Sequence, residues 1–553
     1  MNYCNKALIG AGSQERRRRQ RVPLQALLSC TNVNSLKRFP RTNVHLLDSS
    51  ASGGCIRSSV PLNVGDWIQI HLGKSAAKLK GIAAHKFIAK GRITARIVRI
   101  AKEKCFGDGE KSNSDHFYGI SYAVDLKERL SLLFYRQIPL IVATLFLIGV
   151  LNALYLKSFN IFFFWYQPLF NSYSLFVTLY ILSRFFLAVF YRPPKDVNFL
   201  PSISVVVACK NEEDSIRKTI DCIYESDYPP DLMEVIAIND GSTDNTLHEM
   251  RLTAKDHPGF EIINFEKNLG KRHGMAAGAR KARGEILIYI DSDSFVQPNT
   301  LKKLVQGFSN PEVGAVCGHA NVASYSSNML TKMQQVRYFV AFRVIKASES
   351  IFSTVSCCSG CLAAYRRKFV MDILDVWLNQ SFLGVPATFG DDRSLTNFML
   401  HRYRVLYDSQ AICTTIVPDR YYKFFKQQLR WKKSWIRETF IACKFMWRRH
   451  PLAAFFFYSG AIFPVVAPII VLNALVLPLI GPVLSVDIFG PPSYLYVYGA
   501  FLMAVLYSLV YLLYYRDRIW IYGVAFSFFY MLVLVWQTYY AIITVRDNRW
   551  GTR

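Results

Sequence analysis

Short apolar runs rich in β-branched residues alternate with polar stretches through the middle of the chain. They occupy residues 203–208, 234–239 and 286–290. Runs of this length and composition are typical of buried strands in a parallel sheet. The second run ends in Asp240-Gly-Ser-Thr-Asp-Asn and the third ends in Asp291-Ser-Asp293. Open α/β sheets bind ligands at the carboxyl ends of their strands, so the pattern predicts an α/β domain with these acidic residues in its site.

A different pattern occupies the first part of the chain. Short alternating or β-branched runs lie at residues 67–71, 93–100 and 117–123. Short strands of this kind, separated by turn residues, predict a small β-barrel over about residues 15–126. We expect residues 1–14 to be disordered.

Five long apolar segments follow, at about residues 138–155, 173–189, 452–484, 494–515 and 519–545. The first two are each close to the ~20 residues that a membrane-spanning helix needs. Lys127, Arg129, Arg192 and Lys195 flank the outer ends of the first pair, whereas its connecting loop is expected to contain Lys157. The positive-inside rule then puts the barrel and the central domain in the cytosol, and we expect a multi-pass protein of the bacterial inner membrane.

The topology after residue 450 stays open on sequence grounds. Pro464, Pro468, Pro478 and Pro482 indicate that the first C-terminal segment is broken into pieces. The last segment has arginines at both ends, which a kinked or re-entrant hairpin would explain. An additional crossing earlier in the chain would explain them equally well.

Composition supports a membrane protein and narrows its partners. Of the 553 residues 52% are apolar and 14% are aromatic, and the net charge is +27. Nucleic acid is the first partner that such a charge indicates. The basic residues flank apolar segments, however, which favours a cytosolic membrane face that handles anionic nucleotides. We therefore expect no nucleic-acid partner. The twelve cysteines form no paired framework, and Cys358-Ser-Gly-Cys361 is interpreted as a packed loop.

The acidic motifs and a basic pair between them have the chemistry of a nucleotide-sugar site. Asp291 and Asp293 can hold the Mg²⁺ or Mn²⁺ ion that neutralises a leaving diphosphate. Asp240 is expected to accept hydrogen bonds from a uridine base or ribose, unless its turn serves as a helix N-cap. Lys271 and Arg272 are adjacent cations that suit a diphosphate or a carboxylated sugar.

Three further motifs resemble the processive family 2 glycosyltransferases, with hyaluronan synthases as the most similar pattern. They are Gly390-Asp-Asp-Arg, Gln427-x-x-Arg430-Trp431 and the terminal Trp550-Gly-Thr-Arg553. The resemblance covers roughly residues 130–553 and implies inverting transfer on a GT-A fold, with extrusion of the polymer. The N-terminal barrel is a departure from this pattern. Chitin-like, glucan and alginate-like products therefore remain alternatives to hyaluronan.

The same resemblance implies a role for each site residue. Asp392 matches the catalytic base and Asp391 the second acid, with Asp391 as the alternative base if the loop shifts in register. The two also suit a helix start. Gln427, Arg430, Trp550 and Arg553 match residues that bind the UDP-sugar. Trp431, Gly360 and Arg393 match the acceptor site. The aromatic and basic residues after Trp431 are also typical of an interfacial membrane helix.

Two N-terminal motifs resemble the PilZ domain, which binds cyclic di-GMP. They are Arg17-x-x-x-Arg21 and Asp48-x-Ser50-x-x-Gly53. Two guanidinium groups four residues apart can grip phosphates and stack on guanine. A solvated or membrane-facing basic patch is the simpler interpretation of the arginines alone. The two motifs together favour a cyclic di-GMP sensor.

We therefore expect a membrane-embedded processive synthase that uses UDP-sugars and is activated by cyclic di-GMP. A non-processive transferase acting on a polyprenyl carrier and a catalytically inactive exporter that responds to cyclic di-GMP are the alternatives. The expected order is a PilZ-like barrel (15–126), a transmembrane hairpin (130–192), a GT-A domain (193–420), interfacial helices (421–450) and a C-terminal transmembrane region with the terminal tail (451–553).

Overall fold

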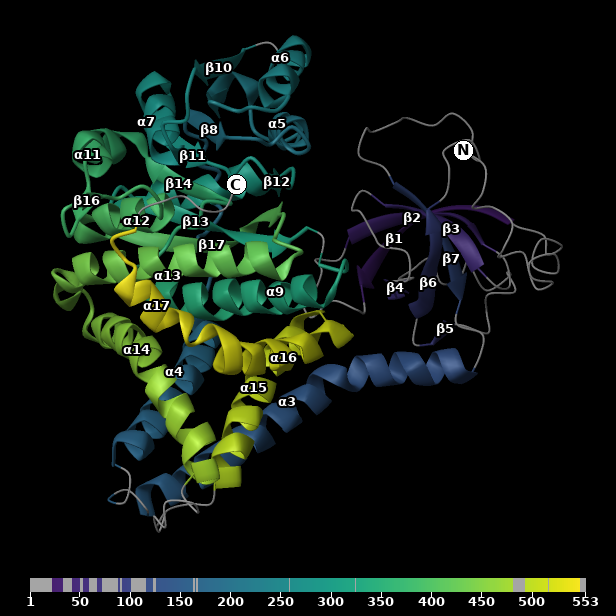
Figure 1. The fold of residues 1–553 in the computed structure, drawn as a ribbon. Coiled ribbons are helices and arrows are strands. Elements are labelled where there is room, and N and C mark those ends of the chain that lie inside the picture. Colours follow the sequence, from purple (N-terminus) through teal and green to yellow (C-terminus); the bar gives the residue numbers. More distant parts are fainter. Residues whose placement is uncertain are drawn as a thin grey trace. The chain divides into compact units, whose positions relative to one another are not determined.

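The structure is a computed structural model in two compact units. It describes residues 22–32, 42–49, 53–58, 67–71, 88–89, 92–100, 116–122, 126–162, 165, 168–257, 259–323, 325–480, 493–515 and 517–547. One unit comprises Met1–Ile148 with Leu509–Arg518, and the other comprises Gly149–Ser508 with Ile519–Arg553. Each unit contains its own sheet (Figure 1).

The sheet of the first unit is antiparallel and closes on itself. Its described strands are β1 (Val22–Asn32), β2 (Thr42–Ser49), β3 (Gly53–Ser58), β4 (Trp67–His71), β5 (Ile88–Ala89), β6 (Arg92–Ile100) and β7 (His116–Tyr122). They follow the order β4-β1-β2-β3-β7-β6-β5, and β4 also pairs with β6. Ile56, Ile68 and Ile70 are buried. The three predicted runs correspond to β4, β6 and β7.

The cyclic di-GMP motifs fall only partly in this sheet. Asp48 lies near the end of β2, where the register of β2 against β3 shifts, and Gly53 begins β3. Arg17, Arg21 and Ser50 lie outside the described residues. The PilZ assignment therefore stays a prediction.

Four described helices are long and apolar enough to cross a membrane. The candidate spans are Gln137–Phe162 in α3 (Leu126–Phe162), Pro168–Phe190 (α4), Pro451–Leu472 in α14 (Pro451–Ile480) and Val497–Tyr515 in α15 (Ser493–Tyr515). A fifth candidate is a pair of helices, Arg518–Leu534 and Gln537–Ile543, that bends by 44° at its break. The kink considered for the last segment is therefore present in the structure.

Two sequence expectations about these segments are corrected. Lys157 lies inside α3 rather than in the connecting loop, and its ammonium donates to Ser174 Oγ at 2.6 Å. The described part of the proline-rich segment is one continuous helix, α14, which includes Pro464 and Pro468. Hydroxyl groups of neighbouring helices donate to backbone carbonyls in this stretch, for example Tyr539 to Val465 at 3.0 Å. Proline is tolerated inside membrane-spanning helices where neighbouring groups or local adjustments satisfy the freed backbone groups.

The second unit is built around a mixed sheet whose described order is β10-β9-β8-β11-β14-β13-β17-β12. Its strands are β8 (Ile203–Cys209), β9 (Met233–Asp240), β10 (Phe260–Phe265), β11 (Ile286–Tyr289), β12 (Ser294–Val296), β13 (Val313–Val322), β14 (Ala363–Arg366) and β17 (Arg404–Thr415). Strands β10, β9, β8 and β11 are mutually parallel, and β14 runs antiparallel to both β11 and β13. The three strands predicted in this domain correspond to β8, β9 and β11.

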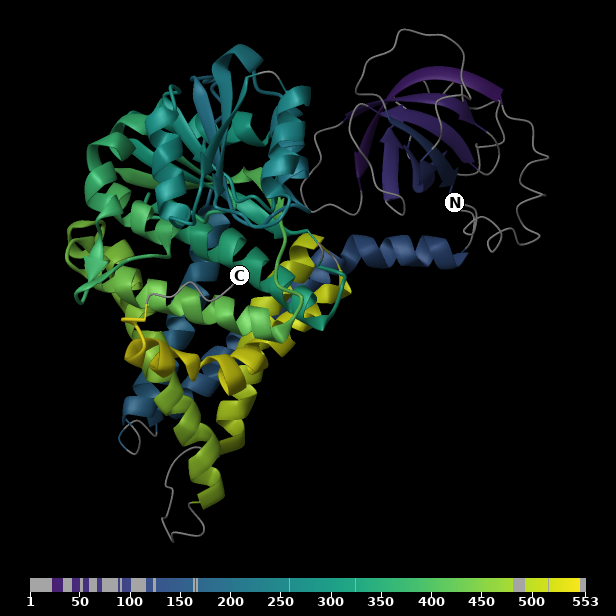
Figure 2. The same ribbon diagram turned by 45° about the horizontal axis from the view of Figure 1, so that its top comes forward.

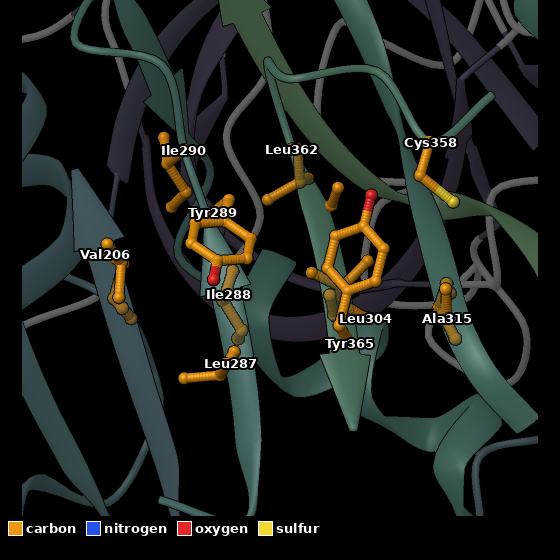
Figure 3. Close-up of a cluster of buried hydrophobic side chains, with 14 of the residues drawn as sticks. Val206, Leu287, Ile288, Tyr289, Ile290, Leu304, Ala315, Cys358, Leu362 and Tyr365 are labelled. Carbon is orange, nitrogen blue, oxygen red and sulfur yellow. The ribbon is translucent and has the colours of Figure 1, made fainter. Parts of the chain in front are cut away.

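Apolar side chains on β8, β11, β13 and β14 form the core of this unit (Figure 3). Leu287 and Ile288 of β11 are fully buried, as is Val205 of β8. Tyr289 of β11 and Tyr365 of β14 meet edge to face, with ring centroids 5.8 Å apart. Burial on both faces explains why these strands are continuously apolar rather than alternating.

Helices cover both faces of the sheet. They are α5 (Ile216–Tyr224), α6 (Thr246–Asp256), α7 (Lys271–Lys281), α8 (Thr300–Leu304), α9 (Met329–Val340), α10 (Ala347–Ile351), α11 (Arg367–Leu378), α12 (Asp391–Arg402) and α13 (Tyr421–Cys443). Helix α7 packs on β8 and β9, whereas α13 packs on α12 and α17 (Gln537–Ile543). Helices α9 and α13 run side by side (Figure 2). Helix α16 (Ile521–Phe529) packs on α9, and α17 packs on α13. Helix α13 therefore joins the sheet domain to the C-terminal helices.

Candidate active site

Strands β9 and β11 lie on either side of β8, where the order of the parallel strands reverses. Ligands of open α/β sheets bind at the carboxyl ends of the strands beside such a point. Asp240 ends β9 and is buried. Its carboxylate accepts hydrogen bonds from the backbone N–H groups of Leu269 at 2.7 Å and Gly270 at 3.0 Å. Helix α6 begins with Asn245 as its N-cap, so Asp240 is not the capping residue. Asp240 thus holds the loop that leads into α7, and its contact with a nucleotide stays a prediction.

Asp291 and Asp293 form the acidic pair at the end of β11. The ammonium of Lys271 contacts Asp291 Oδ1, and Asp293 Oδ1 accepts a hydrogen bond from Thr415 Oγ1 at 3.4 Å. Burial raises the pKa of Asp293 to about 7, with the charge of Asp291 adding to the shift and Lys271 opposing it. Two close carboxylates of this kind suit a divalent cation, which would relieve their repulsion.

A loop at residues 356–360 lies against this pair. A Cβ atom added at Gly360 would come within 3.0 Å of Asp291 Oδ1 and 3.2 Å of Lys271 Nζ. Any side chain at position 360 would therefore displace the carboxylate or the ammonium. The acceptor contact expected of Gly360 stays a prediction. Cys358 is fully buried, and its backbone N–H donates to Thr396 Oγ1 at 2.9 Å.

The second acidic pair opens α12 and divides between two environments. Gly390 precedes it with φ 79°, in the left-handed region that glycine tolerates. Asp391 is buried and accepts a hydrogen bond from Arg272 Nε at 2.7 Å. Asp392 is less buried, and the thiol of Cys357 lies 3.6 Å from its Oδ2. Asp392 is therefore the carboxylate better placed for chemistry, although both residues also lie in the first turn of α12.

Arg272 differs from the sequence expectation. Its side chain is 3% exposed, and besides Asp391 it donates to Trp377 O at 3.0 Å and Gln380 Oε1 at 3.1 Å. Lys271, by contrast, reaches Asp291. Successive side chains on a helix point about 100° apart, so two adjacent cations do not serve one ligand. In this structure Arg272 orders the acidic helix start, and Lys271 is the cation beside Asp291 and Asp293.

Helix α13 carries the Gln-x-x-Arg-Trp motif toward the acidic residues. Burial lowers the pKa of Arg430, and the carboxylates of Asp392, Asp291 and Asp391 oppose the shift. Gln427 Oε1 is buried and has no hydrogen-bond partner within the described part of the chain. The Trp431 ring has the guanidinium of Arg337 5.5 Å from its centroid. Gln427 Oε1 could therefore accept a hydrogen bond from a ligand. The binding roles of Gln427, Arg430 and Trp431, and that of Arg393 in the first turn of α12, stay predictions.

The two lysines after Trp431 hold the C-terminal segment. Lys432 donates to the carbonyl of Leu534 and to Thr538 Oγ1 at 3.1 Å. These two residues lie on either side of the break between Leu534 and α17. The ammonium of Lys433 lies 3.2 Å from the backbone carbonyl oxygen of Asp547 and 3.5 Å from the carboxylate of the same residue. Sequence reasoning interpreted these lysines only as part of an interfacial helix. Trp550 and Arg553 lie outside the described residues, so their roles stay predictions.

Comparison with known proteins gives the class of enzyme. Residues 204–374 match the family model described as glycosyl transferase family 2. The chain is 28% identical over 425 residues to hyaluronan synthase of Streptococcus pyogenes, which covers 76% of this chain and 98% of that one. It is 34% identical over 265 residues to an N-acetylglucosaminyltransferase of Rhizobium meliloti (strain 1021), covering 47% and 62% respectively.

One of the solved structures that the chain matches is the mannosyltransferase PcManGT of Pyrobaculum calidifontis in complex with GDP-Man and Mn²⁺. It is 21% identical, with a TM-score of 0.47, and the match covers 72% of this chain and 100% of that one. The family match and the sequence relatives establish that this protein is a glycosyltransferase. Residues 204–374 carry the family 2 domain, and the chain resembles hyaluronan synthase over 76% of its length. Its apolar helices indicate a membrane protein.

Proposed function

We propose that this glycosyltransferase polymerises UDP-sugars processively and extrudes the polymer through the membrane. The observation that carries the proposal is the 356–360 loop, which contacts both acidic centres: Gly360 packs on Asp291, and Cys357 reaches Asp392. A donor diphosphate at the first centre and an acceptor hydroxyl at the second would be neighbours. The four to five apolar helices of the described chain support extrusion by the same polypeptide.

Asp392 acts as the catalytic base in this proposal. The acceptor hydroxyl oxygen bonds to the anomeric carbon of the donor sugar as the bond between that carbon and the diphosphate oxygen breaks. The proton of the hydroxyl passes to the Asp392 carboxylate, and UDP leaves with the bonding electrons. A single displacement of this kind inverts the anomeric configuration. Positioned bases contribute about 10²–10⁴ in rate.

Asp291 and Asp293 would hold Mg²⁺ or Mn²⁺. No group of three or more His, Cys, Asp or Glu side chains that could hold a metal occurs among the described residues. Such a two-carboxylate site fits an ion that is completed by substrate phosphates and water. When bound, the ion supplies positive charge to the departing diphosphate. Lys271, already paired with Asp291, adds a fixed positive charge beside the same position.

The remaining site residues orient the two substrates. Arg430 provides a guanidinium for the diphosphate near the acidic centres, and Gln427 Oε1 provides an unoccupied acceptor. Asp240 would reach the base or ribose from the end of β9. Trp431 offers an apolar face to the acceptor sugar. Gly360 and Arg393 are the other proposed residues of the acceptor site.

Hyaluronan is the product that the comparisons favour. A relative that is matched over 98% of its length is a hyaluronan synthase, so UDP-glucuronate and UDP-N-acetylglucosamine are the proposed donors. The N-acetylglucosaminyltransferase relative supports the second donor independently and also favours a chitin-like polymer as the alternative product.

Control by cyclic di-GMP and the cellular location complete the proposal. Arg17, Arg21, Asp48, Ser50 and Gly53 are the proposed dinucleotide ligands. The antiparallel barrel of β1–β7 supports this assignment by its strand pairing. The positive-inside pattern supports a bacterial inner-membrane protein whose barrel and catalytic unit are cytosolic.

The test is a radiolabelled transfer assay in membranes that contain the full-length protein. UDP-glucuronate and UDP-N-acetylglucosamine are supplied singly and together, with and without cyclic di-GMP, and the product is digested with linkage-specific hydrolases. High-molecular-mass product that requires both donors supports hyaluronan synthesis. Product from UDP-N-acetylglucosamine alone supports the chitin-like alternative. Absence of transfer under every condition would overturn the proposal.

A further inference from the structure

A short π-helical turn, η7 (Ala341–Lys346), connects α9 to α10 and ends at a buried lysine. Turns of this type are rare and are frequent at functional sites. The Lys346 side chain lies in the protein interior with 8% exposure of the residue. An ammonium group in such a position needs hydrogen-bond acceptors. The acceptors of the Lys346 ammonium show which part of the chain this turn holds in place.

Lys346 donates to the 356–360 loop at two points. Its ammonium contacts the carbonyl oxygen of Cys357 and Ser359 Oγ, the latter at 3.0 Å. Glu349, three residues later, accepts from the backbone N–H of Ser356 at 3.0 Å and lies 3.2 Å from Ser356 Oγ. Two side chains of opposite charge on one helical segment therefore hold successive residues of the loop.

The held loop is the one that contacts both acidic centres. The thiol of Cys357 lies 3.6 Å from Asp392 Oδ2, and Gly360 packs directly on Asp291. A shift of the loop backbone therefore changes the environment of the base and of the metal pair together. Displacements of about 1 Å in a catalytic arrangement can reduce the rate by about 10²-fold.

The supporting segment is itself fixed to the apolar helices. Ser348, between the two anchors, accepts a hydrogen bond from the Arg184 guanidinium of α4 at 2.9 Å. The same guanidinium lies 4.5 Å from the ring centroid of Phe456 in α14. The segment at residues 346–349 is thus braced on one side by α4 and α14 and holds the loop on the other.

We propose that Lys346, with Glu349, is a positioning residue that sets the 356–360 loop between Asp392 and Asp291. Lys346 acts through the loop, since its ammonium donates to the Cys357 carbonyl and to the Ser359 hydroxyl. This inference rests on the proposed function, because it assigns Asp392 to the acceptor and Asp291 to the donor diphosphate. Loss of the Lys346 contacts then slows transfer more than it weakens donor binding.

The test compares Lys346→Met with Lys303→Met in the full-length protein. Lys303 is a partly buried lysine that pairs with Asp196, and it serves as a matched control. Transfer from radiolabelled UDP-sugar gives kcat and KM, calorimetry gives the affinity for UDP, and thermal unfolding in detergent gives Tm. For Lys346→Met we expect kcat to fall by roughly 10- to 100-fold while the donor KM changes by less than about threefold. We expect the control to retain kcat.

The outcomes separate this inference from the proposed function. An active wild-type enzyme with an unchanged kcat in Lys346→Met overturns the positioning role alone. A fall in kcat that is accompanied by weaker UDP binding and a lower Tm overturns it as well, because that combination indicates a general structural role. If Lys346→Met does not accumulate in membranes, Ser359→Ala decides: a fall confined to kcat supports the inference, and unchanged activity overturns it. An inactive wild-type enzyme counts against the proposed function instead.

Discussion

Arg272 and Asp391 form a buried ion pair, with Nε and Oδ1 2.7 Å apart and side chains 3% and 4% exposed. Arg272 lies in the first turn of α7 and Asp391 begins α12, so the pair joins the starts of two helices. The guanidinium neutralises one member of the Asp391-Asp392 pair inside the protein. The other member is left beside Cys357. This division of roles leads to the first two predictions.

Arg272→Met should destabilise the protein strongly, because it leaves the Asp391 carboxylate buried without its cation. Removing one partner of a buried ion pair typically costs about 3–5 kcal/mol. The matched control is Arg280→Met on the same helix, whose pair with Asp375 is exposed and should contribute about 0–1 kcal/mol. Thermal unfolding in detergent measures both variants. Equal Tm values for the two would contradict the structural role of Arg272.

Asp392→Asn should reduce transfer by roughly two to four orders of magnitude, because the amide keeps the shape of the side chain but cannot accept the proton. UDP affinity and Tm should stay close to those of the wild type. Asp391→Asn should instead lower Tm, because it weakens the pair with Arg272. Single-turnover transfer and calorimetry provide the readouts, and undiminished turnover of Asp392→Asn would remove this residue from the role of base.

Asp293→Ala should abolish polymer synthesis while the protein still inserts into membranes, because the two-carboxylate site loses one ligand. Chelator treatment of wild-type membranes should have the same effect, and added Mg²⁺ or Mn²⁺ should restore the wild type but not the variant. Transfer assays on chelated and reconstituted membranes make the comparison. Full turnover of the variant in chelator-treated membranes would show that the pair holds no catalytic metal.

Lys433→Met should raise the donor KM, because Lys433 fixes Asp547 shortly before Trp550 and Arg553, which the family resemblance assigns to the diphosphate. Asp547→Asn should have a smaller effect in the same direction, since the backbone contact of Lys433 survives. The double variant should be less impaired than the sum of the two, because the residues share one interaction. Lys426→Met is the control, since Lys426 lies on the same helix and its ammonium lies 4.3 Å from the Tyr422 ring centroid. Additive effects would exclude the coupling.

Arg17→Ala with Arg21→Ala should eliminate cyclic di-GMP binding, measured by calorimetry on the full-length protein in detergent. Polymerisation by the double variant should no longer respond to the dinucleotide. If the arginines hold the active-site entrance closed in the absence of ligand, basal activity should also rise. Loss of binding with normal activation would exclude the regulatory assignment. Loss of both with low basal activity would keep the sensor and discard the tethering mechanism.

The linear pattern of apolar residues was enough to predict most secondary structure that positions the site. Strands β8, β9 and β11, the acidic residues at their ends and the apolar helices all follow from runs whose burial is encoded residue by residue. The motif Gln427-x-x-Arg430-Trp431 likewise placed α13 at the site. Such features depend on neighbours along the chain and are therefore visible in the sequence.

The tertiary structure decided which polar groups meet. Arg272 looked like a phosphate ligand beside Lys271, yet its partner is Asp391, 119 residues away. No local pattern marks Lys346 as the support of the 356–360 loop, because that role exists only when the π turn and the loop pack together. The continuity of α14 through Pro464 and Pro468 is likewise a property of the folded chain that its prolines did not predict. Periodicity reports which face of an element is buried, whereas the pairing of charges depends on how whole elements pack, so the sequence determined the framework of this site and the fold determined its connections.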